Sequence, residues 1–243
     1  MSLTDHFRPV LKKILRPLAP KHLLKEHDIY LRLGPKAGRI YARLRVLDAV
    51  GIRRLSERRV PLGAHSFVFV CFGNIMRSPM AELMLERALA EHGLEGITVS
   101  SAGVHASPGQ EAHPHARVAA RELGLPLDYH RSKLLTPEIV AQADALFAMD
   151  FQNKAELLDR FAEARGRIFM LSAYAGEGQR YREIPDPYFG DQDEARRCFA
   201  VLQTCVHNLV GSLRPGPGQA AVQQGGVRRA TSVMPAKKKM RGR

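Results

Sequence analysis

The sequence predicts an α/β protein with a four-stranded parallel sheet and helices on both faces, preceded by a helical N-terminal extension. Three observations predict it. Short apolar runs alternate with segments of helical period between residues 66 and 212. The first of these runs is followed by a small loop and a proline that is typical of the first turn of a helix. Charge also divides the chain, because residues 67–212 carry 14 Lys and Arg against 19 Asp and Glu, whereas both ends are strongly basic.

The individual elements follow in order from residue 66. Phe67 to Val70 is a continuous apolar run, which predicts a strand that is covered on both faces. Ser78-Pro79 predicts a helix start, with the serine as the capping residue, and this helix ends at Gly93. Further strands are predicted at 97–99, 145–149 and 168–171, and further helices at 112–123, at 152–161 and around 195–209. This strict alternation implies right-handed crossovers and a parallel sheet.

The two ends of the chain hold its excess of positive charge. The net charge of +13 divides into +10 for residues 1–66, −5 for residues 67–212 and +8 for residues 213–243. We therefore predict three regions: a basic, helical extension (1–65), a catalytic domain (66–212) and a disordered basic tail (213–243). Apolar residues recur at helical spacing between basic ones from Phe7 to Leu18, and a second periodic stretch carries Ile40, Leu44, Leu47 and Val50.

A basic amphipathic extension allows two interpretations. Residues 1–60 and 213–243 could bind an anionic membrane surface or an acidic partner. The extension could also pack on the domain with its charges in water, which we favour. Specific nucleic-acid binding is not expected, because the central domain is mildly acidic.

Composition predicts a cytoplasmic protein, with peripheral attachment to the membrane as an option. The chain contains no run of about 18 apolar residues and no secretory signal at its start. Its three cysteines form neither a CxxC motif nor a Cys/His cluster, which argues against a disulfide framework and a zinc site.

The stretch SFVFVCFGNIMRSP carries the chemistry. Cys71 lies at the carboxyl end of the first strand, where α/β sheets bind their ligands. A loop between a strand and a helix N-terminus offers backbone N–H groups to an anion, and the same field stabilises a thiolate. Arg77 can hold phosphate oxygens with its planar fork, Gly73 permits close approach, and Asn74 tolerates a left-handed conformation. Ser78 can donate a hydrogen bond to the thiolate. The alternative is an inert, buried cysteine beside an ordinary turn.

The motif VCFGNIMRSPMAE resembles the phosphate-binding loop of the low-molecular-weight protein tyrosine phosphatases, V-C-x-G-N-x-C-R-S-P-x-A-E. Further matches follow in the expected order: Ser101-Ala102-Gly103, His130 with Arg131-Ser132, Met149-Asp150, and Asp186-Pro187-Tyr188. The resemblance covers about residues 66–212 and includes neither extension.

The resemblance implies double displacement without a metal or cofactor. Cys71 would attack phosphorus to form a cysteinyl-phosphate, while Arg77 and the loop amides hold the charge. Asp186 would protonate the leaving phenolate and later activate water. His130 and Ser101 are expected behind the loop, where His130 supports Asn74. The substrate-binding set comprises Phe72, Gly73, Asn74, Ile75, Met76, Ser78, Tyr188 and Phe189.

Three of these positions bear on the substrate, which we expect to be a phosphotyrosine protein. Tyr188 and Phe189 can sandwich a phenyl ring at the mouth of a deep site, although one of them could instead be core. His105 is a further candidate for the rim. Ile75 favours phosphotyrosine, because a protein-arginine phosphatase branch of the family carries threonine there.

One departure from the family pattern affects redox chemistry. Met76 replaces the cysteine that usually precedes the loop arginine, so we expect over-oxidation of Cys71 to be hard to reverse. The main alternative activity on this fold is arsenate reduction, which requires resolving cysteines. Cys198 and Cys205 have a usable spacing but lie in a helical pattern, and we interpret them as core residues. A phosphate-binding pseudoenzyme that acts as a membrane or partner adaptor is the non-enzymatic alternative.

Overall fold

The predicted four-stranded parallel sheet is confirmed in a computed structural model, which describes residues 21–52, 59–61, 63–176 and 183–213. The strands are β1 (Ser66–Cys71), β2 (Thr98–Gly103), β3 (Ala145–Ala148) and β4 (Ile168–Met170). Their order is β2-β1-β3-β4, and every pairing is parallel. The helix predicted from Phe7 to Leu18 and the tail from 214 onward lie outside the described residues.

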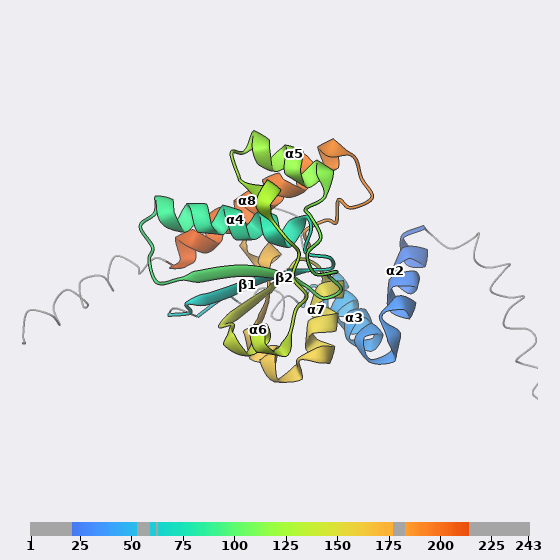
Figure 1. The fold of residues 1–243 in the computed structure, drawn as a ribbon. Helices are drawn as coiled ribbons and strands as arrows, with labels where there is room; N and C mark the ends of the chain where they lie inside the picture. Colours follow the sequence, from blue (N-terminus) through green and yellow to red (C-terminus); the bar gives the residue numbers. More distant parts are fainter. Residues whose placement is uncertain (1–20, 53–58, 62, 177–182, 214–243) are drawn as a thin grey trace, which may run out of the picture.

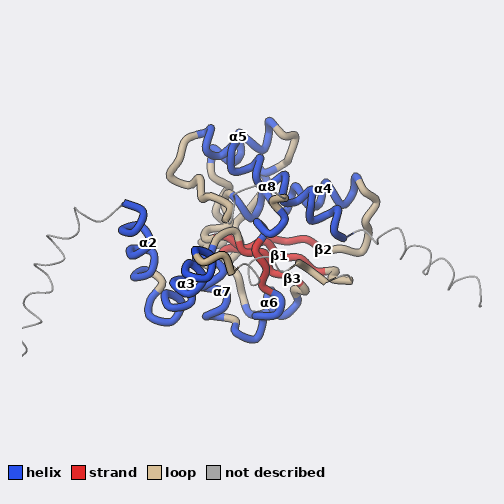
Figure 2. The backbone as a smooth tube through the Cα atoms, turned by 180° about the vertical axis from the view of Figure 1, so that it is seen from behind, coloured by secondary structure: helices blue, strands red, loops and turns tan. Residues whose placement is uncertain are grey.

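Helices cover both faces of the sheet, as predicted (Figure 1). The helices α4 (Arg77–Glu91), α5 (Pro114–Glu122) and α8 (Gln192–Leu213) cover one face. The helices α3 (Gly34–Ala49), α6 (Pro137–Gln142) and α7 (Phe151–Arg160) cover the other. Short 3-10 turns complete the domain: η3 (Leu127–Tyr129), η4 (Ala162–Arg167) and η5 (Leu171–Tyr174). Figure 2 shows the same layers from behind, with the strands between the two groups of helices.

The central strand β1 explains the position of the cysteine. Side chains alternate along a strand, so Phe67 and Phe69 join the core under α4 and α8, and Val68 and Val70 join the core under α7. The ring of Phe69 stacks on that of Phe147 with centroids 5.2 Å apart. Cys71 follows Phe67 and Phe69 on the same face, and it therefore points toward the start of α4.

The N-terminal extension forms two helices within residues 21–49, and it packs on the domain. The helix α2 (Lys21–Arg32) is followed directly by α3, which lies against α7. The buried stripe of α3 includes Ala37, Tyr41 and Leu44, at the spacing expected of one helix face. The predicted stripe shares Leu44 with this one, but its Ile40 and Leu47 are only partly buried, and its Val50 lies past the helix end and is 63 % exposed. In the described ranges, no helix combines the length and the apolar character that a bilayer crossing requires.

Two local predictions differ from the structure. Ser78 was expected to cap α4, but the helix begins at Arg77, and the cap position, Met76, makes no side-chain hydrogen bond. The Ser78 hydroxyl is bonded within the preceding loop instead, which makes it unavailable as a cap. The helix α6 was not predicted, although Thr136 accepts a hydrogen bond from the Ile139 amide and Pro137 occupies its first turn.

Candidate active site

The loop between β1 and α4 turns its carbonyl groups outward. The carbonyl oxygens of Cys71 and Phe72 accept hydrogen bonds from the amides of Val104 and His105, and that of Ile75 accepts one from a third backbone amide. Donors outside the loop therefore satisfy these three carbonyl groups. The Asn74 amide already donates to the Cys71 sulfur over 3.2 Å. The backbone N–H groups of such a loop, together with the N-terminus of α4, can bind an anion.

Asn74 is the centre of a buried hydrogen-bond network below this loop. Its backbone φ is +54°, the left-handed value that the sequence anticipated. Its Nδ2 donates to the hydroxyl oxygens of Ser78 at 2.9 Å and Ser101 at 2.8 Å. Ser101 in turn donates to the carboxylate of Glu82. The Ser78 hydroxyl also lies 3.0 Å from the Cys71 sulfur, where it can donate to a thiolate, and 3.4 Å from the carbonyl oxygen of Ala102.

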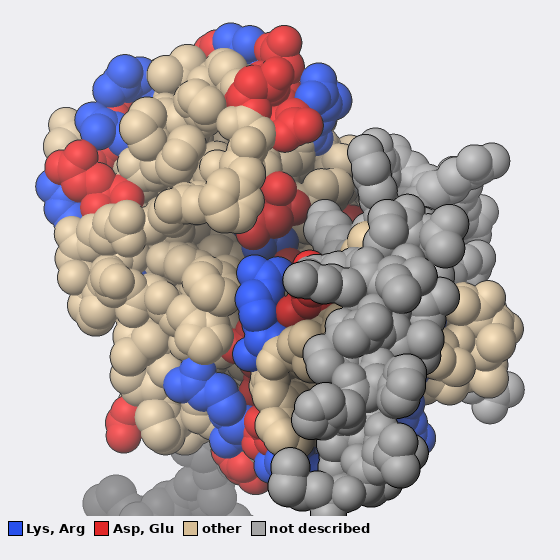
Figure 3. Space-filling model, turned by 90° about the vertical axis from the view of Figure 1, so that its right-hand side faces the viewer, with Lys and Arg blue, Asp and Glu red and all other residues tan. Residues whose placement is uncertain are grey.

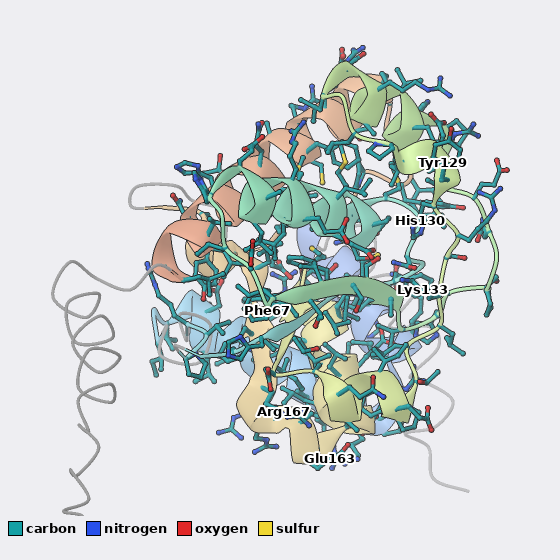
Figure 4. The ribbon with its side chains drawn as sticks, turned by 60° about the vertical axis from the view of Figure 1, so that its left-hand side comes forward. Phe67, Tyr129, His130, Lys133, Glu163 and Arg167 are labelled. Carbon is teal, nitrogen blue, oxygen red and sulfur yellow. The ribbon has the colours of Figure 1, made fainter. Side chains whose placement is uncertain are left out.

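The segment after η3 supports the loop from the outer side of β2. His130 donates from Nε2 to the backbone carbonyl oxygen of Asn74 over 2.7 Å. The backbone amide of Lys133 donates to the side-chain Oδ1 of Asn74, also over 2.7 Å. Figure 4 shows His130 and Lys133 on one segment beside the sheet. Burial lowers the pKa of His130, the hydrogen bond to Asn74 opposes that shift, and two neighbouring cations add to it. The neutral imidazole is therefore favoured in the folded protein.

Gly103 has a steric reason for its place in the Ser101-Ala102-Gly103 motif. A Cβ at this position would lie 2.7 Å from the carbonyl oxygen of Phe72 and 2.8 Å from the amide nitrogen of Asn74. Both are backbone atoms of the anion-binding loop, so they cannot move aside without distorting it. The motif therefore allows β2 to approach the loop closely.

Arg77 closes the loop and is 2 % exposed. Its NH1 donates to Asp150 Oδ2 at 2.7 Å and to the carbonyl oxygen of Ile184 at 3.1 Å. Its NH2 lies 2.9 Å from Asp186 Oδ2. Burial alone would lower the pKa of this guanidinium, but the two carboxylates and Cys71 raise it. Arg77 therefore remains a fixed cation that links the loop to Asp186.

The aromatic residues expected at the mouth are on the surface. Tyr188 is 44 % exposed and Phe189 is 96 % exposed, with ring centroids 4.8 Å apart. Neither is a core residue in this arrangement. Tyr188 also lies 5.6 Å from the ring of His113. Phe72 is exposed and its ring lies 4.6 Å from that of His105.

Ile75 and Met76 differ in burial from Phe72 and Gly73, which belong to the same loop. Both side chains are buried in the core beneath α4 and α8. Gly73 is partly exposed, and a Cβ there would make ordinary contacts with Ile75 alone. The glycine is therefore not required by contacts within the protein.

Two acidic residues belong to the site without having been given a role from the sequence. Asp150 caps α7 by accepting from the Asn153 amide at 2.7 Å, while its other oxygen pairs with Arg77. Glu82 is buried below Ser101, and burial raises the pKa of its carboxyl group. The position of Asp150 at the end of a parallel strand was a usable signal. The sequence signal for Glu82 was its match to the last position of the family loop pattern.

The fold and the loop define an α/β protein with a Cys-x5-Arg loop at the carboxyl end of its central strand. The sequence profile of the low molecular weight phosphotyrosine protein phosphatases matches residues 66–218. The chain belongs to this family. It is a phosphatase, a hydrolase that acts on phosphoproteins.

The similarity extends over nearly the whole length of each of the following relatives. The protein-arginine-phosphatase of Bacillus subtilis (strain 168) is 35 % identical over 147 residues, which are 60 % of this chain and 95 % of that protein. The probable low molecular weight protein-tyrosine-phosphatase EpsP of Ralstonia nicotianae is 36 % identical over 149 residues, 61 % of this chain and 96 % of that protein. The tyrosine phosphatase Wzb from Escherichia coli K30, solved in complex with sulphate, matches with a TM-score of 0.56 and 28 % identity, over 62 % of this chain and 99 % of that one.

Proposed function

We propose that the protein hydrolyses phosphotyrosine in proteins through a cysteinyl-phosphate on Cys71. One observation carries this proposal: the Cys71 sulfur accepts from the Asn74 amide at 3.2 Å and lies 3.0 Å from the Ser78 hydroxyl, within a loop that Arg77 closes. These donors stabilise a thiolate, which is the nucleophilic form of cysteine. The same amides and guanidinium would hold the phosphate oxygens.

The reaction proceeds in two displacements. The Cys71 sulfur attacks phosphorus, the bond from phosphorus to the phenolic oxygen breaks, and the carboxyl group of Asp186 gives its proton to that oxygen. The Asp186 carboxylate then takes a proton from water, whose oxygen attacks phosphorus while the sulfur–phosphorus bond breaks. Inorganic phosphate leaves and the thiolate is restored. The 2.9 Å contact between Arg77 and Asp186 supports this assignment, because a phosphate on Arg77 would lie beside the acid.

The residues around the loop have supporting roles in this proposal. Asn74 holds the left-handed turn, Ser101 and His130 hold Asn74, and Ser78 orients the thiolate. The amides from Phe72 to Met76, including that of Gly73, cradle the phosphate. Two exposed rings, Tyr188 and Phe189, receive the phenyl group of the substrate.

Phosphoarginine is the second candidate substrate, because the Bacillus subtilis relative is named a protein-arginine-phosphatase. Ile75 favours phosphotyrosine, since the arginine-specific branch carries threonine at this position. The exposed aromatic pair also favours a planar phenyl ring. Arsenate reduction is less well supported, because burial raises the pKa of both Cys198 and Cys205 to about 12. Such thiols are weak nucleophiles near neutral pH.

The two basic ends of the chain have a proposed role outside catalysis, in localising the enzyme. We assign residues 1–65 to an extension, 66–212 to the phosphatase domain and 213–243 to a basic tail. The charge of +10 on residues 1–66 and +8 on residues 213–243 supports attraction to an anionic membrane or an acidic partner of a cytoplasmic enzyme. Sedimentation with liposomes that contain anionic lipid, compared with neutral liposomes, tests this assignment. Equal sedimentation with both would refute attraction to the membrane.

A substrate panel tests the activity. Phosphotyrosine, phosphoserine and phosphoarginine peptides are compared with the wild type, Cys71→Ser and Asp186→Ala. We expect turnover of phosphotyrosine above the other two, no turnover by Cys71→Ser, and a loss of about 10²–10⁴-fold in Asp186→Ala. Preference for phosphoarginine would overturn the substrate assignment. Unchanged turnover by Cys71→Ser would overturn the mechanism.

A further inference from the structure

Glu183 connects the N-terminal extension to the segment that carries Asp186. It lies three residues before Asp186, and its side chain is 21 % exposed. Its Oε1 accepts from the backbone amide of Phe151 over 2.7 Å, at the first residue of α7. Its Oε2 accepts from Arg45 NH1 over 2.6 Å. One carboxylate therefore joins α3 of the extension to α7 and to the start of the loop that carries Asp186 (residues 183–191), which we call the Asp186 loop.

Arg45 is held in place for this contact from several sides. Its Nε donates to the hydroxyl oxygen of Tyr41 at 3.0 Å and pairs with Glu26 at 2.8 Å. Tyr41 is buried and donates in turn to Glu26 at 2.6 Å. The guanidinium also lies 5.3 Å from the ring centroid of Phe151. Because α2, α3 and α7 all fix this cation, it presents NH1 to Glu183 in one orientation.

Glu183 and Phe151, which are joined by a hydrogen bond, are each next in sequence to a residue that contacts Arg77. Ile184 follows Glu183, is fully buried, and donates from its amide to the carbonyl oxygen of Met149 at 2.8 Å. Its own carbonyl oxygen accepts from Arg77. On the α7 side, the residue before Phe151 is Asp150, the other partner of Arg77. Movement of Glu183 would thus be passed to both ends of the Arg77 network.

The contact between Glu183 and Arg45 depends on the positive charge of Arg45. Burial raises the pKa of Glu183, the positive charge of Arg45 opposes that shift, and Asp150 adds to it. A buried carboxylate without its cation is costly, so loss of Arg45 would loosen this segment or drive Glu183 to its neutral form. Figure 3 views the side of the molecule that carries α2 and α3, and acidic and basic side chains meet along the middle of this face.

We propose that Arg45 is a positioning residue for the general acid, acting through Glu183 to hold the Asp186 loop over Arg77. The inference rests on the proposed role of Asp186 and goes beyond it, because it makes the extension part of the working enzyme. A positioning residue of an acid affects substrates according to their leaving group. A poor leaving group needs the proton from Asp186, whereas a good one departs without it.

The test compares kcat/KM for phenyl phosphate and 2,4-dinitrophenyl phosphate in the full chain. Arg45→Met keeps the apolar stem on Tyr41 and Phe151 and removes the charge. We expect kcat/KM for phenyl phosphate to fall about tenfold and that for the dinitrophenyl ester to fall less than twofold. Arg45→Lys should recover part of the loss. Glu183→Gln should reproduce it, and Arg45→Met combined with Glu183→Gln should cost no more than either change alone.

Lys36→Met is the matched control. Lys36 lies on the same helix and pairs with Asp159 of α7 at 2.7 Å, but it does not contact Glu183. We expect it to leave the ratio between the two esters unchanged. Equal losses on both esters in Arg45→Met and Glu183→Gln, or an unchanged phenyl phosphate rate, would overturn the proposal. Asp186→Ala in the same series separates the role of Asp186 from that of Arg45. An unchanged ratio between the two esters in this variant would refute the assignment of Asp186 as the general acid.

Discussion

Substitution of Asn74 tests the network that shapes the anion-binding loop. Asn74→Ala removes three side-chain hydrogen bonds, two buried ones to Ser78 and Ser101 and a partly buried one from the Lys133 amide. At about 1 kcal/mol each, their loss costs about 3 kcal/mol of unfolding free energy. The φ of +54° adds about 1 kcal/mol for alanine, so we expect a total of about 4 kcal/mol. Asn74→Gly avoids the backbone penalty and should cost about 3 kcal/mol.

Urea unfolding and inhibition by inorganic phosphate provide the assay. We expect both Asn74 variants to bind phosphate more weakly, because the Asn74 amide lies against the Cys71 sulfur at the base of the anion site. Asn208→Ala is the control, since among the described residues the Asn208 side chain makes one hydrogen bond, to the carbonyl oxygen of Tyr174. It should cost about 1 kcal/mol and leave phosphate inhibition unchanged. An Asn74→Ala protein within 1 kcal/mol of the wild type, with normal phosphate inhibition, would refute this account of the loop.

Three further predictions follow from other contacts. Gly103→Ala should lose about 1–3 kcal/mol of stability and most of its phosphate affinity, because the new Cβ meets backbone atoms of the loop at 2.7–2.8 Å; normal affinity would contradict the steric argument. Burial lowers the pKa of His130, so the unfolded chain takes up a proton first as the pH falls below about 6.5. The unfolding free energy should therefore decline below that pH, and more steeply in the wild type than in His130→Gln; equal slopes would count against a neutral, buried His130. Cys198→Ala and Cys205→Ala should keep phosphotyrosine turnover within about twofold, since burial holds both thiols protonated. Loss of a thioredoxin-dependent arsenate reduction in either variant would instead reveal a resolving cysteine.

The sheet was predictable because its signals are local. The continuous apolar run in β1 and the alternation with helical segments fix a parallel sheet, and the strand end fixes where Cys71 lies. The left-handed turn at Asn74 was also anticipated, because asparagine next to glycine tolerates that conformation. These inferences need only neighbouring residues and the general rules of α/β folds.

Other features depend on contacts that the sequence does not reveal. The ion pair between Arg45 and Glu183 joins residues 138 positions apart, and neither residue belongs to a pattern. The need for glycine at position 103 arises from the approach of another segment. Ser78 had two possible uses, as a cap and as a partner of the cysteine, and only the tertiary network decides between them.

Direct detection of phosphate on Cys71 tests the central claim most directly. Asp186→Ala should slow hydrolysis of the cysteinyl-phosphate, so rapid acid quenching during turnover of 2,4-dinitrophenyl phosphate should trap it for peptide mass spectrometry. The account predicts a phosphorylated peptide that contains Cys71, absent from Cys71→Ala and from unreacted enzyme. Turnover without any phosphate on Cys71, or phosphate on another residue, would contradict it.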